Sequence, residues 1–167
     1  MKQKILDFIR TGKRSFDGAT GTMLMRLGLG IGGCPEEVPE DLMVRVHKEY
    51  ITAGAHFITT NTFGGNRLKL MRYAAEGRLA GINSRNVKIA RAAAADSGVF
   101  VAGDIGPTGE FIEPYGDYTP EQMEDVFWEQ AAVLAESGAD LIIIETMSAL
   151  EEMAAAIRAS RRTELPV

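Results

Sequence analysis

The chain has 167 residues, of which 46% are hydrophobic and 25% charged, which is enough apolar material for one domain with a buried core and excludes a disordered chain. Its formal net charge is -5, with acidic and basic residues interspersed, which argues against a nucleic-acid groove because such a groove needs a basic face. No apolar stretch reaches the length of a membrane span, and the single cysteine, Cys34, excludes an internal disulfide, so we expect a cytoplasmic protein that binds neither nucleic acid nor membrane.

Short apolar runs alternate with segments whose apolar residues recur at helical spacing. The predicted strands are residues 15–17, 57–60, 99–104 and 141–144. The predicted helices are residues 39–53, 79–97, 120–137 and a last one from residue 148 onward. Residues 165–167 resemble the entry to a fifth strand.

Two capping boxes mark predicted helix starts. One pairs Thr119 with Gln122, with Pro120 as the first helical residue, and the other pairs Ser148 with Glu151. The last helix is predicted to pack through an apolar stripe of Leu150, Met153, Ala154 and Ile157.

The repetition of strand and helix predicts an α/β fold with a parallel sheet and right-handed crossovers. A doubly wound sheet and a (β/α)8 barrel both begin in this way. The loops after the strands are long and rich in glycine, whereas the returns, such as residues 137–140, are short, which favours a barrel. A full barrel needs about 250 residues. The four βα units therefore predict the first half of a (β/α)8 TIM barrel.

Two acids end predicted strands. The aliphatic run 141–144 stops at Glu145, and Asp17 follows Phe16 near the N-terminus. A carboxylate at the tip of a buried strand is costly to bury and adds nothing to packing, and the strand tips of α/β barrels carry the chemistry. The two acids together predict a site for a cationic group such as a substrate ammonium.

Three glycine-rich or polar loops follow the strands. Gly18 lets the backbone approach a ligand closely, although the loop also fits a turn in which Asp17 caps its own backbone. Thr60 and Asn61 either line a pocket or satisfy loop backbone groups. Asp104 lies in a segment that lacks the GxGxxG spacing and the lysine of a phosphate loop, so we interpret it as a rigid active-site turn.

The remaining metal and acid–base candidates are weak. Cys34 has no cysteine or histidine near it at the spacing of metal ligands. His47 lies near the apolar face of a predicted helix and His56 precedes a strand, so we interpret both as packing or surface residues.

Five segments in register, each in a strand-to-helix loop, resemble the homocysteine S-methyltransferase family, and within it the N-terminal homocysteine-binding domain of cobalamin-dependent methionine synthase. The matching segments are Asp17-Gly18-Ala19-Thr20-Gly21-Thr22, Cys34-Pro35-Glu36, Thr60-Asn61-Thr62-Phe63, Gly103-Asp104-Ile105-Gly106-Pro107 and Ile144-Glu145-Thr146. The resemblance spans nearly the whole chain.

The resemblance implies a barrel that binds L-homocysteine at a zinc ion, which holds the thiol as a thiolate nucleophile for an activated methyl group. It implies that Asp17 and Glu145 hold the substrate amino group. The other substrate-binding positions that it implies are Gly18, Thr60, Asn61 and Asp104.

The family's zinc ligands are three cysteines in the C-terminal half of the barrel, and no residue of this chain matches them. We therefore expect no metal ligand and no catalytic residue within residues 1–167, which resemble a partial homocysteine-binding domain that ends before the zinc half. Zinc is expected in the complete domain, and cobalamin and methyltetrahydrofolate in the parent protein. The methyl donor stays open, because users of methylcobalamin, betaine and S-methylmethionine share these motifs.

Two classes of function fit this sequence. One is a methyltransferase domain whose partner is the missing C-terminal half-barrel. The other is a non-catalytic half-barrel that binds an amino acid, pairs with another half-barrel or associates with itself. A zinc-free aldolase-type barrel would need a Schiff-base lysine at a strand tip, and none of the four predicted tips carries one.

Overall fold

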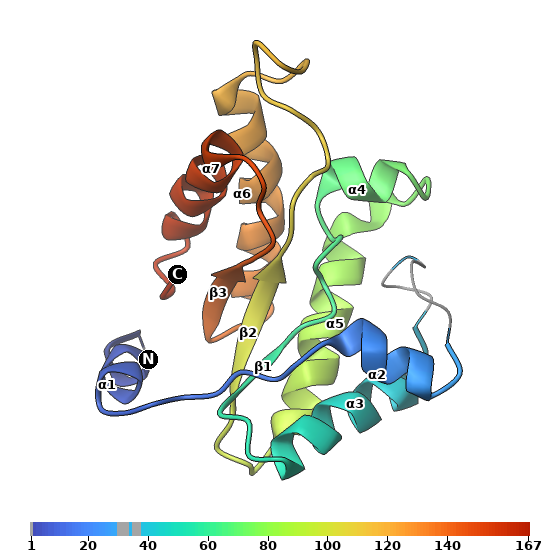
Figure 1. Ribbon diagram of the computed structural model, residues 1–167, viewed down its shortest axis with the longest axis vertical. Coiled ribbons are helices and arrows are strands. Elements are labelled where there is room, and N and C mark those ends of the chain that lie inside the picture. Colours follow the sequence, from blue (N-terminus) through green and yellow to red (C-terminus); the bar gives the residue numbers. More distant parts are fainter. Residues whose placement is uncertain (1, 30–33, 35–37) are drawn as a thin grey trace.

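The computed structural model describes residues 2–29, 34 and 38–167, and it shows parallel strands with helices packed around them (Figure 1). The elements in chain order are α1 (Lys2–Arg10), α2 (Thr20–Arg26), α3 (Glu40–Thr52), β1 (Phe57–Thr59), α4 (Arg67–Met71), η2 (Glu76–Arg78), α5 (Leu79–Ala94), β2 (Phe100–Ile105), α6 (Pro120–Glu136), β3 (Leu141–Ile144) and α7 (Leu150–Arg161).

The three strands of the described sheet are parallel, and their order β1-β2-β3 follows the chain. Phe57 lies opposite Phe100, and Asp104 lies opposite Ile143. Beyond β3, the backbone N–H of Ile142 donates to the carbonyl of Pro166 at 2.9 Å. The last residues thus lie beside β3, where the sequence predicts that a further strand begins.

The predicted first strand, residues 15–17, is wrong as a strand. Phe16 forms only an isolated parallel bridge with Phe57. The backbone N–H of Asp17 still donates to the Phe57 carbonyl at 2.9 Å, but the chain then leaves the sheet and enters α2 at Thr20. The segment nevertheless occupies the position beside β1 that the prediction assigns to it.

Alternation along the strands separates two faces of the sheet. On one face, here called the inner face, the side chains of Phe57, Phe100 and Ala102 pack together with Leu141 and Ile143. On the other face, Ile58 and Val101 pack against Ala90 and Ala94 of α5. Helices α6 and α7 cover the same outer face further along, around the buried Ile142.

Helix α1, which the sequence analysis does not predict, covers the lower part of the inner face. Its Ile5 is fully buried there, and the ring of Phe8 lies 5.3 Å from that of Phe100 and 6.0 Å from that of Phe57. Phe16 stacks on Phe57 with 4.6 Å between the ring centroids. These aromatic contacts dock the N-terminal helix, because aromatic pairs at such distances are favourable beyond the area they bury.

The long helices follow the sequence prediction closely. The capping box of α6 is present, with Thr119 accepting from the Gln122 N–H at 3.2 Å and the Gln122 side chain accepting from the Thr119 N–H at 2.9 Å. Helix α5 begins at Leu79, as predicted, and ends at Ala94. None of the helices in the described part of the chain is both long and apolar enough to cross a membrane.

The start and the packing face of α7 differ from the prediction. Its N-cap is Ala149, which makes no side-chain capping bond, so the predicted box of Ser148 with Glu151 is wrong. The predicted stripe also fails, since Leu150 is 78% exposed. Apart from Glu152, the buried face consists of small residues, among them Ala155 and Ala159, which allow α7 to approach α6 closely.

Candidate functional site

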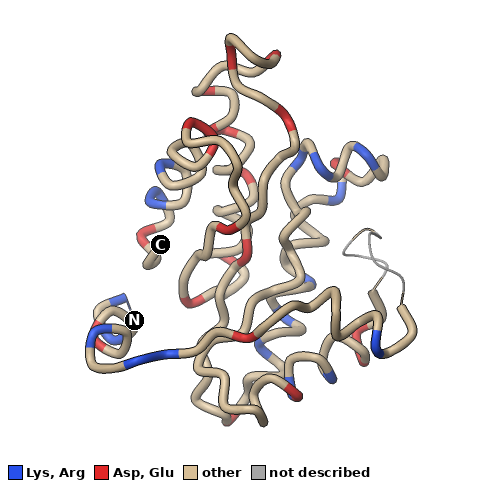
Figure 2. Tube along the Cα trace, viewed as in Figure 1, with Lys and Arg blue, Asp and Glu red and all other residues tan. Residues whose placement is uncertain are grey.

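Three acids line one cavity of about 1060 Å³ at the C-terminal ends of the strands: Asp17, Asp104 and Glu145. The two-residue period of the strands brings two of them together. Asp104 lies two residues after Ala102, and Glu145 lies two residues after Ile143, so both acids lie on the inner-face side of the sheet, at the C-terminal ends of their strands. Acidic positions lie near the centre of the molecule where the strands end, while Lys and Arg lie mostly on the surrounding helices (Figure 2).

Asp17 is fixed to the neighbouring strand. Its carboxylate accepts from the Thr59 backbone N–H at 2.8 Å and from the Thr59 hydroxyl at 3.1 Å. Burial raises the pKa of Asp17 to about 6, against the lowering effect of the Thr59 hydrogen bonds, and repulsion from Glu145 adds to the rise. Asp17 and Glu145 both line this cavity, and their predicted role in holding an ammonium group stays a prediction.

Asp104 is the most deeply buried of the three acids, with 5% of its surface exposed. Burial raises the pKa of Asp104 well above its usual range, and repulsion from Glu145 and Asp17 and a hydrogen bond with the Glu145 side chain act in the same direction. Its Oδ1 atom is buried without a hydrogen-bond partner among the residues that the structure describes. An unpaired carboxyl oxygen beside two other acids is suited to receive a cation.

Beyond the end of β1, threonine hydroxyl groups take the place of backbone groups in hydrogen bonding to β2. The Asp104 backbone N–H donates to Thr60 Oγ1 at 3.0 Å, and Thr62 Oγ1 donates to the Asp104 carbonyl at 2.7 Å. The two hydroxyls lie 2.6 Å apart. Thr60 lines the cavity, and its hydroxyl also satisfies the backbone of Asp104, so both alternatives left open by the sequence describe this residue.

Gly18 and Asn61 also line the cavity. A Cβ on Gly18 would lie 3.0 Å from the Tyr50 hydroxyl, so the tyrosine leaves little room for a side chain there. The Nδ2 of Asn61 is buried and makes no hydrogen bond to any described residue. A buried amide donor without a partner is costly in the free protein and suits a ligand oxygen.

The turn after β2 is packed against the loop after β1. The Gly106 N–H donates to the Phe63 carbonyl at 3.1 Å, and a Cβ on Gly106 would lie 2.5 Å from the Phe63 ring. Phe63 lines the cavity. The glycine therefore lets the two loops meet closely enough to set one wall of the site.

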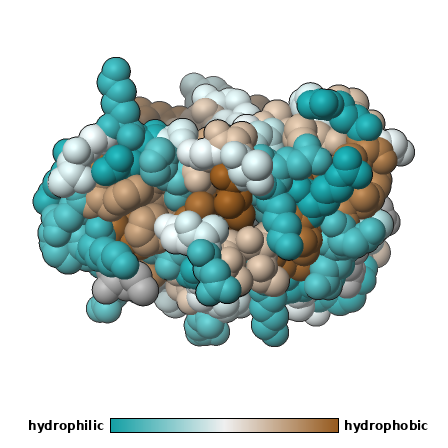
Figure 3. Space-filling model, turned by 90° about the horizontal axis from the view of Figure 1, so that it is seen from below, coloured by the Kyte–Doolittle hydropathy of each residue, from teal (hydrophilic) through white to brown (hydrophobic). Residues whose placement is uncertain are grey.

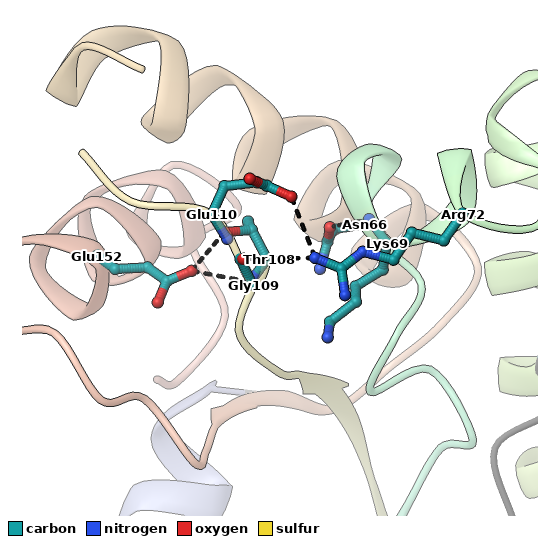
Figure 4. A network of polar contacts seen from close by, with 7 residues as sticks. All are labelled: Asn66, Lys69, Arg72, Thr108, Gly109, Glu110 and Glu152. Atoms are coloured by element: carbon teal, nitrogen blue, oxygen red, sulfur yellow. Dashed lines mark hydrogen bonds and ion pairs between the residues drawn. The ribbon is translucent and has the colours of Figure 1, made fainter. Parts of the chain in front are cut away.

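Polar contacts tie the next part of the same turn to helices on both sides (Figure 4). Glu152 of α7, itself 5% exposed, accepts from the Thr108 N–H at 2.8 Å and from the Thr108 hydroxyl at 2.6 Å. Arg72, which follows α4, donates to the Gly109 carbonyl at 3.3 Å and to Glu110 at 3.1 Å. The neighbouring Lys69 and Tyr73 line the cavity, so these contacts position its rim.

The histidines lie apart from the cavity lining. His47 is buried in α3 with neither ring nitrogen bonded to any described residue, and burial lowers its pKa to about 4. His56 lies at the opposite end of β1, where its Nδ1 is 2.9 Å from the Ser15 hydroxyl. His47 is thus a packing residue, as interpreted from the sequence.

Cys34 is a free, buried cysteine in the cavity lining, whereas Pro35 and Glu36 of the same matching segment lie outside the described residues. Within residues 2–29, 34 and 38–167, no group of three or more His, Cys, Asp or Glu side chains could hold a metal ion. The residues present therefore do not fit the three-cysteine zinc site that the resemblance implies.

The sequence analysis misses the amides behind the site. Gln130 of α6 and Asn83 of α5 are fully buried and bind the loop that follows β1. It also misses the buried Glu152. All three residues lie on helices, where a polar residue is expected to face water. The one sequence signal that could have indicated their burial is their position among apolar neighbours.

Comparison with known sequences identifies the family. The family model described as Homocysteine S-methyltransferase matches residues 15–167. Over 172 residues the chain is 32% identical to methionine synthase from Mycobacterium tuberculosis (strain ATCC 25618 / H37Rv), covering 95% of this chain and 14% of that protein. Over 160 residues it is 32% identical to methionine synthase from Mycobacterium leprae (strain TN), covering 87% of this chain and 13% of that protein. The chain spans about one seventh of these relatives.

Solved structures share the fold. The metallated form of the homocysteine methyltransferase MmuM from Escherichia coli superposes with a TM-score of 0.80 at 22% identity, covering 96% of this chain and 63% of that chain. The oxidized form gives 0.78 at 23% identity, covering 92% and 59%. At such identity the likeness shows the fold alone. The family match over residues 15–167 shows that this chain belongs to the homocysteine S-methyltransferase family.

Proposed function

We propose that this chain forms the homocysteine-binding part of a methyltransferase that makes methionine. The observation that carries the proposal is the convergence of Asp17, Asp104 and Glu145 on one cavity at the ends of the strands. An amino-acid ammonium has three donors and no acceptor, so it suits a group of carboxylates. Burial is the main cause of the raised pKa of Asp17 and of Asp104, and repulsion from Glu145 adds to both; a bound cation offsets both effects.

The other lining residues have distinct proposed roles. The unpaired Nδ2 of Asn61 is a donor for the substrate carboxylate. Gly18 keeps the backbone accessible to the ligand, and its neighbour Tyr50 leaves little room for a side chain there. Thr60 orders Asp104 through the backbone. The homocysteine sulfur would then be the end of the ligand left free for the methyl group.

Zinc activation of that sulfur lies outside this chain in our proposal. The sequence contains one cysteine, and the described residues contain no metal-ligand cluster. Cobalamin and methyltetrahydrofolate would likewise belong to the parent protein. Cys34 is unpaired, which agrees with the proposed cytoplasmic location.

We also propose that residues 1–167 are the first half of a (β/α)8 barrel. Residue 16 lies beside β1 and residue 166 lies beside β3, so the spatial order follows the chain on both sides of β1-β2-β3. A barrel keeps this order throughout, whereas a doubly wound sheet reverses direction. An apolar groove of about 670 Å³ runs along β3 between α1 and α7, lined in part by Met153, Ile157 and Leu165. Seen from below, apolar surface shows between hydrophilic side chains (Figure 3). A complementary half-barrel is the proposed partner for the open side.

Titration of the isotope-labelled chain with L-homocysteine under reducing conditions tests the binding proposal by NMR. We expect the variants Asp17→Asn and Glu145→Gln to weaken binding at least about tenfold, because each removes a charge from the ammonium site. The matched control is Glu49→Gln, which removes a surface carboxylate of α3.

The analogue 4-mercaptobutanoate lacks the amino group and keeps the thiol and carboxylate. We expect it to bind at least about tenfold more weakly than homocysteine to the wild-type chain, and equally weakly to the two variants. Equal binding of analogue and homocysteine to the wild-type chain would contradict the ammonium site.

A further inference from the structure

The amide of Gln130 lies behind the candidate site, in the middle of α6 and without any exposed surface. Its Nε2 donates to the Thr62 carbonyl at 2.7 Å and lies 3.4 Å from the Asp104 carbonyl. These carbonyls belong to two different segments, the loop after β1 and the upper end of β2. One side chain thus joins the two segments that carry the polar lining of the cavity.

A second amide fixes the orientation of the first. Asn83 of α5 accepts from Gln130 Nε2 at 3.3 Å and itself donates to the Gly65 carbonyl at 2.8 Å. Gln130 Nε2 therefore faces three acceptors and no donor, so the NH2 end must point toward the loops. The Oε1 of Gln130 has no partner within the described part of the chain.

The desolvation of this amide is not explained by packing. A buried amide with one unpaired oxygen costs free energy that an apolar side chain of similar length would avoid. Its neighbours on α6, such as Phe127, Ala131 and Leu134, are apolar. What the amide adds is a hydrogen-bonded link between the Thr62 and Asp104 carbonyls. The loop after β1 also holds the backbone of Asp104 directly, because Thr62 Oγ1 donates to the Asp104 carbonyl and Thr60 Oγ1 accepts from the Asp104 N–H.

We propose that Gln130 is a positioning residue of the homocysteine site: its amide locks the loop after β1 onto the end of β2 and so sets where the Asp104 carboxyl lies relative to Glu145. It touches no ligand itself and acts through the carbonyls of Thr62 and Asp104. This inference rests on the proposed function for the identity of the ligand and goes beyond it in naming what holds the site together.

The experiment compares three variants of the chain. Gln130→Met keeps the length of the side chain and removes both hydrogen-bonding groups. Gln130→Glu replaces the donor by a carboxylate that faces the same three acceptors. Met123→Ala is the matched control, since Met123 is fully buried on the same helix and belongs to the apolar core, but has no amide that could join Thr62 to Asp104.

We expect Gln130→Met to raise the Kd for L-homocysteine at least about tenfold, and Met123→Ala to change it less than about threefold even when its loss of thermal stability is as large or larger. We expect Gln130→Glu to bind worse than Gln130→Met at pH 7.5. Its Kd relative to wild type should improve at pH 5.5, because a protonated glutamic acid regains one donor. Unchanged binding in Gln130→Met, or an equal loss in Met123→Ala, would overturn the proposal.

A second readout needs no ligand. In protein labelled with carbon-13, the titration midpoint of the Asp104 carboxyl should move in Gln130→Met and stay in place in Met123→Ala, because the position of this carboxyl beside Glu145 depends on the link. An unmoved midpoint in Gln130→Met would overturn the positioning role. If the wild-type chain binds no homocysteine, the proposed function fails, while the Asp104 titration still decides the role of Gln130.

Discussion

Asp17 and Thr59 are 42 residues apart in the sequence and are joined by two kinds of hydrogen bond, one from the Thr59 backbone N–H at 2.8 Å and one from its hydroxyl at 3.1 Å. The first acid of the site is therefore held by the end of β1 and does not depend on its own short segment for its position. Because that anchoring lowers the pKa of Asp17 while burial raises it to about 6, the residue titrates close to physiological pH.

Homocysteine binding should weaken as the pH falls below about 6. The folded-state pKa of Asp17 is raised from 3.8 to about 6, so its proton is bound more tightly in the free protein, and an ammonium ligand must displace it. We expect the Kd to rise by up to about tenfold per pH unit below 6. The Asp17→Asn variant should bind weakly at every pH and lose this dependence, and a pH-independent Kd for the wild-type chain between pH 5 and 7.5 would contradict the assignment.

The same shift predicts the opposite trend for the stability of the free protein. A carboxyl whose pKa is higher in the folded state stabilises the fold below its unfolded pKa, and this contribution is lost as the pH rises through about 6. Urea unfolding of wild type and Asp17→Asn at pH 5 and pH 7.5 should therefore show that the asparagine variant gains stability relative to wild type at the higher pH.

His47 should make the fold sensitive to acid. It is 1% exposed, and burial lowers its pKa from 6.5 to about 4, so the unfolded chain binds the proton more readily. Between pH 7.5 and pH 5 this linkage removes about 2 kcal/mol of unfolding free energy. In the variant His47→Met this part of the pH dependence should disappear. An identical pH profile in wild type and variant would show that His47 does not stay neutral in the fold.

Gly65→Ala should destabilise the protein and disturb the site. The added Cβ would lie 2.4 Å from Asn83 Oδ1 and 2.9 Å from Gln130 Nε2, inside the buried amide network. Overpacking of this kind costs about 1–3 kcal/mol. The matched control is Gly81→Ala in α5, where a Cβ meets nothing within 4 Å and should add about 0.5–1 kcal/mol. Urea unfolding measures both changes, and equal stability of the two variants would be inconsistent with a tight network.

The isolated chain should associate or bind a complementary half-barrel. Met153 and Ile157 line an apolar groove beside β3, and burying one such side chain is worth about 1.5–3 kcal/mol. We expect concentration-dependent mass in sedimentation or light scattering. The variant Ile157→Lys should reduce the association, and Lys48→Glu on the outer surface of α3 should not. A stable wild-type monomer with a cooperative melt would count against the half-barrel proposal.

Sequence patterns predict the long elements because their signals are local. Helix α6 has its capping box at Thr119, and β3 is a continuous aliphatic run that ends at Glu145. The short helices α1 and α2 have no such signal, and α4 has only a single capping residue. Helix α1 depends on contacts of Phe8 with residues about 50 and 90 positions away, and α4 is a five-residue helix capped by Asn66.

The errors at α7 have a tertiary cause. The Ser148–Glu151 pattern is a valid local signal, but the helix that forms presents Glu152 to the Thr108 turn and its alanines to α6. The strand-tip rule finds Asp17 and Glu145 because it depends only on the end of each strand, and the family resemblance adds Asp104. It cannot find Gln130 or Asn83, since their partners are backbone carbonyls that only the folded chain brings near.

The aromatic layer under the site has an electrical consequence. Phe57 and Phe100 lie on the same strand faces as Thr59 and Asp104, and Phe8 of α1 packs against both rings. This layer lowers the effective dielectric constant beneath the carboxyl groups, because hydrocarbon does not screen charge as water does. Removing α1 would admit water from below and weaken both the repulsion among the acids and their attraction for a cation. We therefore expect helix α1, Lys2–Arg10, to strengthen the charge affinity of a cavity that none of its residues lines.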